Sequence, residues 1–213
     1  MPGRCRAAPN PAGAHFLHDR ALIARMVGAS GAGDGQLVLD LGAGYGAITA
    51  ALAAAGPRVV AVERDPLLAG RLSRRFEGCS HVTVLAADVR DVPLPRREFL
   101  VVASIPFAVT TALLRRLLGD PSVPLAGAEL IVGWGAGRWL SRPRPRDEET
   151  AWWTARYRIR LAGRDRARHA RRRADRRRLA PPGSGADGTR PRRLSPQAAR
   201  AGLGDHSSVT ISG

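Results

Sequence analysis

A glycine-rich segment and two acidic residues have the types and spacing that best suit ligand chemistry in this sequence. The segment Asp40–Ala47 (DLGAGYGA) follows a short apolar run and carries alternate glycines at Gly42, Gly44 and Gly46. Glycines at a turn between a strand and a helix let a ligand approach the backbone closely. Glu63 closes the next apolar run, 21 residues after Gly42, where a carboxylate can accept hydrogen bonds from both hydroxyls of a ribose. Up to this point the pattern predicts a nucleoside cofactor of any kind, NAD included.

Three acids together favour S-adenosylmethionine over NAD as the cofactor. Asp40 directly precedes the glycines, where an acid suits a cofactor with a cationic amino-acid part and repels a pyrophosphate. Asp88, with Val89 beside it, follows the third apolar run, where its carboxylate can accept a hydrogen bond from an adenine amino group. Asp40, Glu63 and Asp88 then contact the methionine end, the ribose and the base. Taken singly, each acid is better explained as a helix cap or part of a solvated turn.

The elements that must position these acids alternate between strand and helix patterns, which predicts an α/β fold. Strands are expected over residues 36–41, 58–63, 82–86, 98–103 and 129–133, and helices over 21–27, 46–55, 66–76 and 110–118. Residues 153–161 alternate large apolar residues with arginines, as a half-exposed antiparallel strand does. We therefore expect a Rossmann-like, mostly parallel sheet with an antiparallel edge strand and helices on both faces. The carboxyl ends of its strands share one edge, where the three acids would meet.

The segment after the fourth expected strand, Ser104-Ile105-Pro106-Phe107, supplies groups suited to methyl transfer onto an adenine amine. That amine is a poor nucleophile, so the reaction needs in-line placement and acceptors for the charge that develops on nitrogen. The Ser104 hydroxyl and the Ile105 carbonyl are the candidate acceptors. Pro106 fixes the loop, and Phe107 offers a flat face to a base flipped out of its stack. The alternative is an ordinary strand-end turn with Phe107 in the core.

From about residue 10 to residue 163 the chain resembles the erythromycin-resistance (Erm) ribosomal RNA adenine N6-methyltransferases. The motifs that carry the resemblance are Gly13–Leu17 (GAHFL), Asp40–Gly46, Glu63, Asp88 and Ser104–Phe107. In that family, glutamine usually stands at the position of Ala14 and asparagine at that of Ser104. The resemblance implies the class I methyltransferase fold and S-adenosylmethionine as donor, with His15 and Leu17 touching the donor and Ser104 serving both donor and acceptor sites.

The resemblance also implies a substrate, a single adenine of 23S ribosomal RNA. Its N6-methylation would give resistance to macrolide, lincosamide and streptogramin B antibiotics. The nearest alternative is a housekeeping dimethyltransferase of small-subunit ribosomal RNA, because its loop motif is similar. Two alternatives come from other classes of protein. One is an NAD-dependent oxidoreductase that uses the same glycine loop, and the other is a catalytically dead RNA-binding protein, which Ser104 and the C-terminal composition would allow.

Charge divides the chain near residue 163. All 34 basic residues are arginines, against 18 acidic residues, and residues 164–213 hold 13 of these arginines with only four acids. High net charge with few large apolar residues is typical of a disordered segment, which here is either an RNA-binding arm or a solvated tail. Only residues 207–212 (SSVTIS) are typical of a strand. We expect a cofactor-covering segment over residues 1–19, a methyltransferase domain over 20–163 and a largely disordered tail over 164–213.

Several classes of protein are disfavoured by what the sequence lacks. It has no run of 18 apolar residues and no apolar signal core near its start, so no membrane association is expected. Two cysteines and five scattered histidines have no metal-ligand spacing and form no disulfide framework, so we expect no metal and a reduced, cytoplasmic setting. The expected state is a monomer. The Arg142–Arg146 segment forms a stiff basic loop that either meets phosphates or is solvated.

Overall fold

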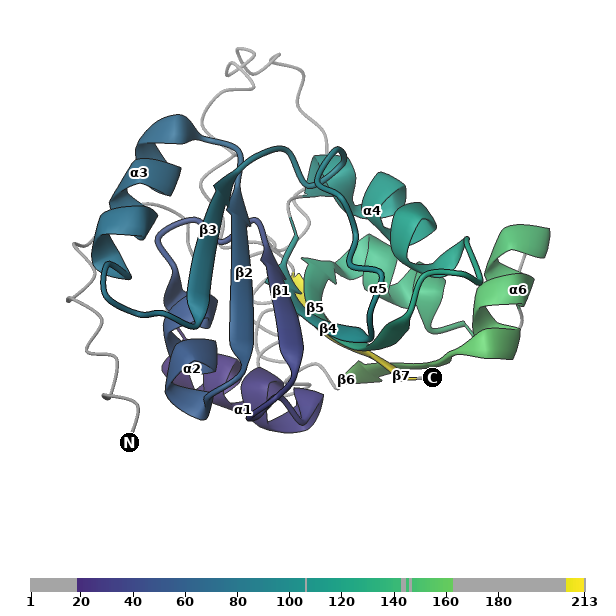
Figure 1. Ribbon diagram of the computed structural model, residues 1–213. Helices are drawn as coiled ribbons and strands as arrows, with labels where there is room; N and C mark the ends of the chain where they lie inside the picture. Colours follow the sequence, from purple (N-terminus) through teal and green to yellow (C-terminus); the bar gives the residue numbers. More distant parts are fainter. Residues whose placement is uncertain (1–18, 106, 143–144, 146, 163–205, 213) are drawn as a thin grey trace, which may run out of the picture. The chain divides into compact units, whose positions relative to one another are not determined.

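The computed structural model describes residues 19–105, 107–142, 145, 147–162 and 206–212. Within these residues seven strands form one sheet, in the order β3-β2-β1-β4-β5-β7-β6 (Figure 1). The strands are β1 (Leu37–Leu41), β2 (Arg58–Glu63), β3 (Val82–Ala86), β4 (Phe99–Ser104), β5 (Leu125–Gly133), β6 (Arg158–Ala162) and β7 (His206–Ser212). The first five pair in parallel, and β7 pairs antiparallel with both β5 and β6. The expected fold class is therefore confirmed, with the antiparallel pairing confined to one edge.

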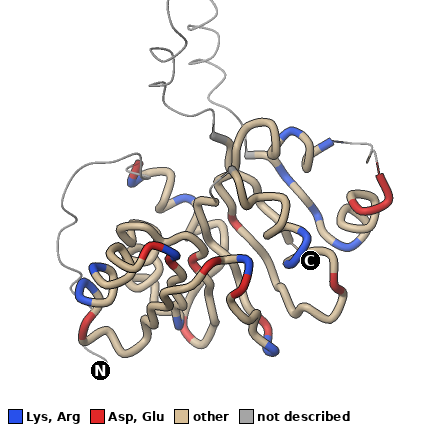
Figure 2. The backbone as a smooth tube through the Cα atoms, turned by 90° about the horizontal axis from the view of Figure 1, so that it is seen from above, with Lys and Arg blue, Asp and Glu red and all other residues tan. Residues whose placement is uncertain are grey.

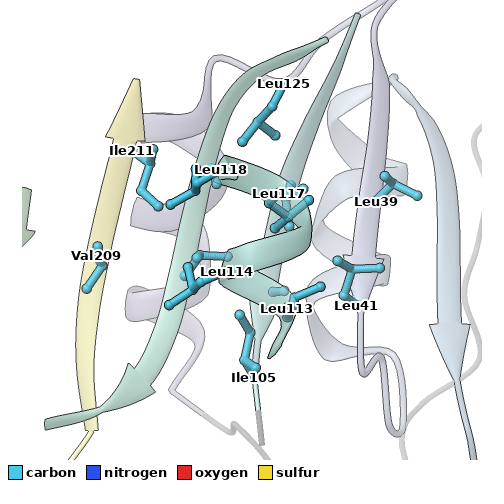
Figure 3. Close-up of a cluster of buried hydrophobic side chains, with 14 of the residues drawn as sticks. Leu39, Leu41, Ile105, Leu113, Leu114, Leu117, Leu118, Leu125, Val209 and Ile211 are labelled. Atoms are coloured by element: carbon cyan, nitrogen blue, oxygen red, sulfur yellow. The ribbon is translucent and has the colours of Figure 1, made fainter. Parts of the chain in front are cut away.

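Helices cover both faces of the sheet. They are α1 (Arg20–Ser30), α2 (Ala47–Ala55), α3 (Pro66–Arg75), α4 (Thr110–Leu118), α5 (Trp134–Leu140) and α6 (Glu148–Arg156), with a 3-10 turn over Phe107–Val109. The first three helices pack on one face, and α4 to α6 pack on the other. Four leucines of α4, at positions 113, 114, 117 and 118, are fully buried in the larger core cluster (Figure 3). This helix is thereby fixed firmly against the sheet.

The strand expected over residues 153–161 is wrong in its first half. Asp147 caps α6 by accepting a hydrogen bond from the Thr150 amide at 2.7 Å, and two glutamates stand in the first turn, which favours a helix start. Trp153 of α6 is buried, and so is Tyr157, the extended residue that ends the helix and whose amide donates to the Trp153 carbonyl at 2.8 Å. The strand β6 begins only at Arg158. Sequence reasoning also missed the short helix α5.

The expected strand near the C-terminus is confirmed, and it belongs to the sheet. Val209 lies opposite Leu130 and Ile211 opposite Ala128 of β5, with 0% and 1% of their surfaces exposed. Burial of these two side chains explains why the segment packs with the domain. Residues 206–212 group with the described residues that precede residue 163, so the tail expected over 164–213 needs correction at its end. Residues 1–18 and 163–205, where the covering segment and the rest of the tail were expected, lie outside the described residues.

In the described part of the chain, no helix is long and apolar enough to cross a membrane, and no three His, Cys, Asp or Glu side chains gather as metal ligands would. Arginines and acids are interspersed along the backbone (Figure 2), and some pair directly, as Arg115 does with Glu149.

Candidate active site at the carboxyl edge of the sheet

The structure brings the three predicted acids to one edge of the sheet. Asp40 lies near the end of β1 and Glu63 at the end of β2, and these strands are adjacent and parallel. Asp88 follows β3, which pairs in parallel with β2. The Ala87 amide donates to the Glu63 carbonyl at 3.1 Å, which holds the chain beside β2 just before Asp88. The expected convergence therefore follows from parallel strand order alone.

The glycine loop has a backbone conformation that would be strained if its glycines were replaced by residues with side chains. Gly42, Gly44 and Gly46 have φ values of +84°, +55° and +79°, the left-handed region that glycine adopts at little cost. A Cβ atom added at Gly46 would collide with Leu72 Cδ1 and lie 3.0 Å from Phe76 Cε2. The third glycine thus permits close packing of the loop against α3.

The Glu63 carboxylate ties the glycine loop to the end of β2. Its Oε2 accepts a hydrogen bond from the Gly44 amide at 2.9 Å, and its Oε1 accepts one from the Asp65 amide at 2.8 Å. A carboxylate oxygen has two lone pairs, so each oxygen retains one for a ligand. Sequence reasoning predicted the ligand-binding capacity but missed this structural role, because the partners are backbone amides that no side-chain pattern reveals.

Asp40 is fully buried beneath α2, and one of its oxygens has no hydrogen-bond partner among the described residues. Its Oδ2 accepts from the Thr49 hydroxyl at 2.6 Å, whereas Oδ1 is the unsatisfied atom. Burial raises the pKa of Asp40 to about 7, against the opposing effect of the Thr49 hydrogen bond. A buried acceptor without a donor costs free energy. The site therefore suits a ligand that brings a cationic or amino group to this atom.

Asp88 is held by an arginine that sequence reasoning did not single out. Its Oδ1 accepts from the Arg90 amide and from Arg90 Nε, both at 2.9 Å, and its Oδ2 accepts from Arg90 Nη2 at 2.7 Å. These bonds, with a smaller contribution from Arg64, hold the pKa of Asp88 well below its ordinary value. Asp88 is therefore a fixed carboxylate. The local signal was the spacing D-V-R, which places a cation two residues after the acid.

Val89 packs partly into the core. So do the first residues of the segment Ser104–Phe107, which we call the acceptor loop because it starts at the end of β4 and carries the candidate acceptor groups. The Val89 side chain is 8% exposed, and its carbonyl accepts a hydrogen bond from Arg116 of α4 at 2.7 Å. Ser104 ends β4 opposite Ile131 and is half-buried, while Ile105 is 3% exposed and its amide donates to the Ile131 carbonyl at 2.9 Å.

Several predicted site residues lie outside what the structure describes. His15, Leu17 and Pro106 are not among the described residues, and neither is most of the basic loop after Arg142. Phe107 opens the 3-10 turn that precedes α4, and its side chain is outside the described part. The roles expected for these residues in donor contact and base stacking therefore stay predictions.

Comparison with known proteins places these residues in a family. The ribosomal RNA adenine dimethylase family matches residues 10–142. An rRNA adenine N-6-methyltransferase of Bacillus licheniformis is 32% identical over 131 residues, which cover 62% of this chain and 46% of that protein. A ribosomal RNA small subunit methyltransferase A of Mycobacterium bovis is 43% identical over 120 residues, or 52% of this chain and 38% of that protein. The chain thus spans less than half the length of these curated relatives.

Solved structures support the fold. The 23S rRNA methyltransferase ErmE superposes with a TM-score of 0.67 at 22% identity, covering 92% of this chain and 69% of that one. A dimethyladenosine transferase from Plasmodium falciparum gives a TM-score of 0.66 at 17% identity, covering 93% of this chain and 63% of that one. The sheet is thus the Rossmann-like sheet of class I methyltransferases. With the family match over residues 10–142, it follows that this chain belongs to the ribosomal RNA adenine dimethylase family.

Proposed function

We propose that this chain transfers a methyl group from S-adenosylmethionine to N6 of an adenine in 23S ribosomal RNA, and thereby confers resistance to macrolide, lincosamide and streptogramin B antibiotics. The observation that carries the proposal is the set of acids at three successive strand ends beside a left-handed glycine loop. The buried, unsatisfied Oδ1 of Asp40 favours a ligand with a cationic amino-acid part. A pyrophosphate would be repelled there whenever the Asp40 carboxyl is ionised.

Each acid of the site has a part in holding the donor. Glu63 keeps one lone pair on each oxygen after its bonds to the Gly44 and Asp65 amides, and these accept from the two ribose hydroxyls. Asp88 keeps a lone pair on Oδ2, which accepts from the adenine amino group. When bound, the donor supplies a methyl group on a positively charged sulfur.

The acceptor loop lies next to the glycine loop because β4 pairs directly with β1. We assign the Ser104 hydroxyl and the Ile105 carbonyl to the target amine, whose hydrogens they accept as positive charge develops on nitrogen. Phe107 stacks on the target base. Serine reaches less far than asparagine, and its own proton must point away from the amine. This predicts a slower transfer than in relatives that carry asparagine there.

The test is methylation of isolated ribosomal RNA with a radiolabelled donor, followed by separation of the 16S and 23S species. The proposal expects label in 23S RNA, recovered as N6-methylated adenosine after digestion. RNA binding without incorporated label would instead support a catalytically dead RNA-binding protein. Calorimetry provides the second arm, because tight binding of NAD without binding of S-adenosylmethionine would overturn the choice of cofactor. The proposal further implies a protein that works in the cytoplasm as a monomer.

One observation favours a second candidate, dimethylation of small-subunit ribosomal RNA. The Mycobacterium bovis small subunit methyltransferase A is 43% identical to this chain over 120 residues, a higher identity over a shorter stretch than the 32% over 131 residues of the Bacillus licheniformis protein. In the labelling experiment this candidate predicts label in 16S RNA alone and unchanged drug susceptibility in a host that expresses the gene. Label in 23S RNA with raised macrolide tolerance would exclude it.

A further inference from the structure

An arginine of α4 that the proposed reaction does not use reaches back to the adenine side of the site. Arg116 Nη1 donates to the Val89 carbonyl and Nη2 donates to the Val92 carbonyl, each at 2.7 Å. These carbonyls lie 27 and 24 residues earlier in the chain. A planar guanidinium that bonds two acceptors at once fixes their direction as well as their distance. Figure 1 shows the chain crossing from β3 toward α4 before it enters β4.

The segment that Arg116 holds is the turn Asp88–Val92. The Asp88 carbonyl accepts from the amides of Asp91 and Val92 at 3.0 and 3.1 Å, which closes the turn. The Val89 and Val92 side chains are buried in the same core cluster as the leucines of α4. Apolar packing therefore holds the turn close to α4, and the Arg116 fork sets its orientation.

The orientation of this turn matters because the Asp88 carboxylate has little hydrogen-bonding capacity left. Arg90 donates two bonds to Oδ1, which uses both lone pairs of that oxygen, and one bond to Oδ2. A single lone pair on Oδ2 remains for a ligand. Because hydrogen bonds weaken steeply as their angle departs from linear, a rotation of the turn would aim this lone pair away from a bound purine.

The neighbouring residue on α4 supplies a matched comparison. Arg115 points away from the turn, pairs with Glu149 of α6 at 2.8 Å, and its side chain is 61% exposed. It has the same charge and size as Arg116 and stands on the same helix. The two positions therefore differ in what they bind and not in helix propensity or charge.

We propose that Arg116 is a positioning residue that makes the donor site selective for adenine, because it holds the Asp88–Val92 turn so that Asp88 presents Oδ2 to the 6-amino group of the purine. The inference rests on the proposed function, in particular on Asp88 as the acceptor for the donor's base. Because only the 3-10 turn Phe107–Val109 separates the acceptor loop from α4, Arg116 also links the positions of the two substrates.

The test is calorimetry on the full chain with S-adenosylhomocysteine and S-inosylhomocysteine, which has a carbonyl oxygen in place of the amino group. A hydrogen bond to a charged group predicts that the unchanged protein prefers the adenosine compound by about tenfold or more. Arg116→Met is expected to reduce this ratio to within about threefold of one. Arg116→Lys should retain more of it, because an ammonium keeps the charge but lacks the fork. Arg115→Met should leave the ratio unchanged.

If the role of Arg116 were purely structural, Arg116→Met would weaken the binding of both compounds equally. An unchanged ratio of the two affinities in this variant therefore overturns the inference. Circular dichroism checks that this variant is folded. If it is not, Arg116→Gln replaces it, and an unchanged ratio there has the same consequence. Failure of the unchanged protein to bind either compound overturns the proposed function itself. Equal binding of both compounds by the unchanged protein overturns the role of Asp88 and, with it, that of Arg116.

Discussion

Replacing Asp40 by asparagine tests whether ionisation of this buried carboxyl group lowers the free energy of unfolding. Burial raises the pKa of Asp40 from 3.8 to about 7, and the nearby charge of Glu63 adds to the effect. A carboxyl group whose pKa is higher in the folded chain binds its proton more tightly there, so stability falls as the pH rises from about 4 through 7. A difference of about three pH units between the two pKa values corresponds to roughly 4 kcal/mol. About half of this, roughly 2 kcal/mol, falls between pH 5.5 and about 8.5.

The assay is urea unfolding at those two pH values. The unchanged protein should lose roughly 2 kcal/mol more stability between them than Asp40→Asn does, because asparagine cannot ionise. Burial also raises the pKa of Glu129, but that group is present in both proteins and cancels in the comparison. Asp19→Asn controls for the loss of one charge, since Asp19 caps α1 and asparagine caps a helix equally well. Equal losses in the unchanged protein and in Asp40→Asn would refute the reasoning.

The remaining predictions concern the loop, the acceptor site and the last strand. Glu63→Ala should weaken S-adenosylhomocysteine binding by about tenfold or more, because ribose acceptors are lost and the Gly44 and Asp65 amides lose their partner; unchanged affinity by calorimetry would contradict the assignment. Phe107→Ala should lower kcat far more than donor affinity, and an equal loss in both would mean that the aromatic ring is structural. Gly46→Ala should cost at least about 1 kcal/mol in unfolding experiments, because its φ is +79° and Leu72 blocks a side chain. Ile211→Ala should cost about 2–5 kcal/mol if β7 is part of the cooperative core, as its 1% exposure indicates; a change below about 0.5 kcal/mol would place β7 outside that core.

The sequence was most informative where a local pattern of residue types directly sets the position of a site residue. Glu63 and Asp88 could be placed because Glu63 closes one short apolar run and Asp88 follows the next, and such runs are the strands of a parallel sheet. Residues 153–161 misled because two periodicities overlap there. Trp153 and Tyr157 follow the helical spacing of α6, whereas Ile159 and Leu161 follow the alternation of β6. Sequence alone did not show where one pattern replaces the other.

By itself, the sequence determined which residues stand at the carboxyl edge: the glycine loop, the acids at the ends of the first three strands, and the segment after β4. These positions depend on chain order and on contacts between near neighbours. Only the tertiary structure decided what holds them. The Arg116 fork spans at least 24 residues, and β7 inserts between β5 and β6 although it is the last strand in the chain. Contacts of that separation depend on how whole elements pack, which no local pattern of residue types specifies.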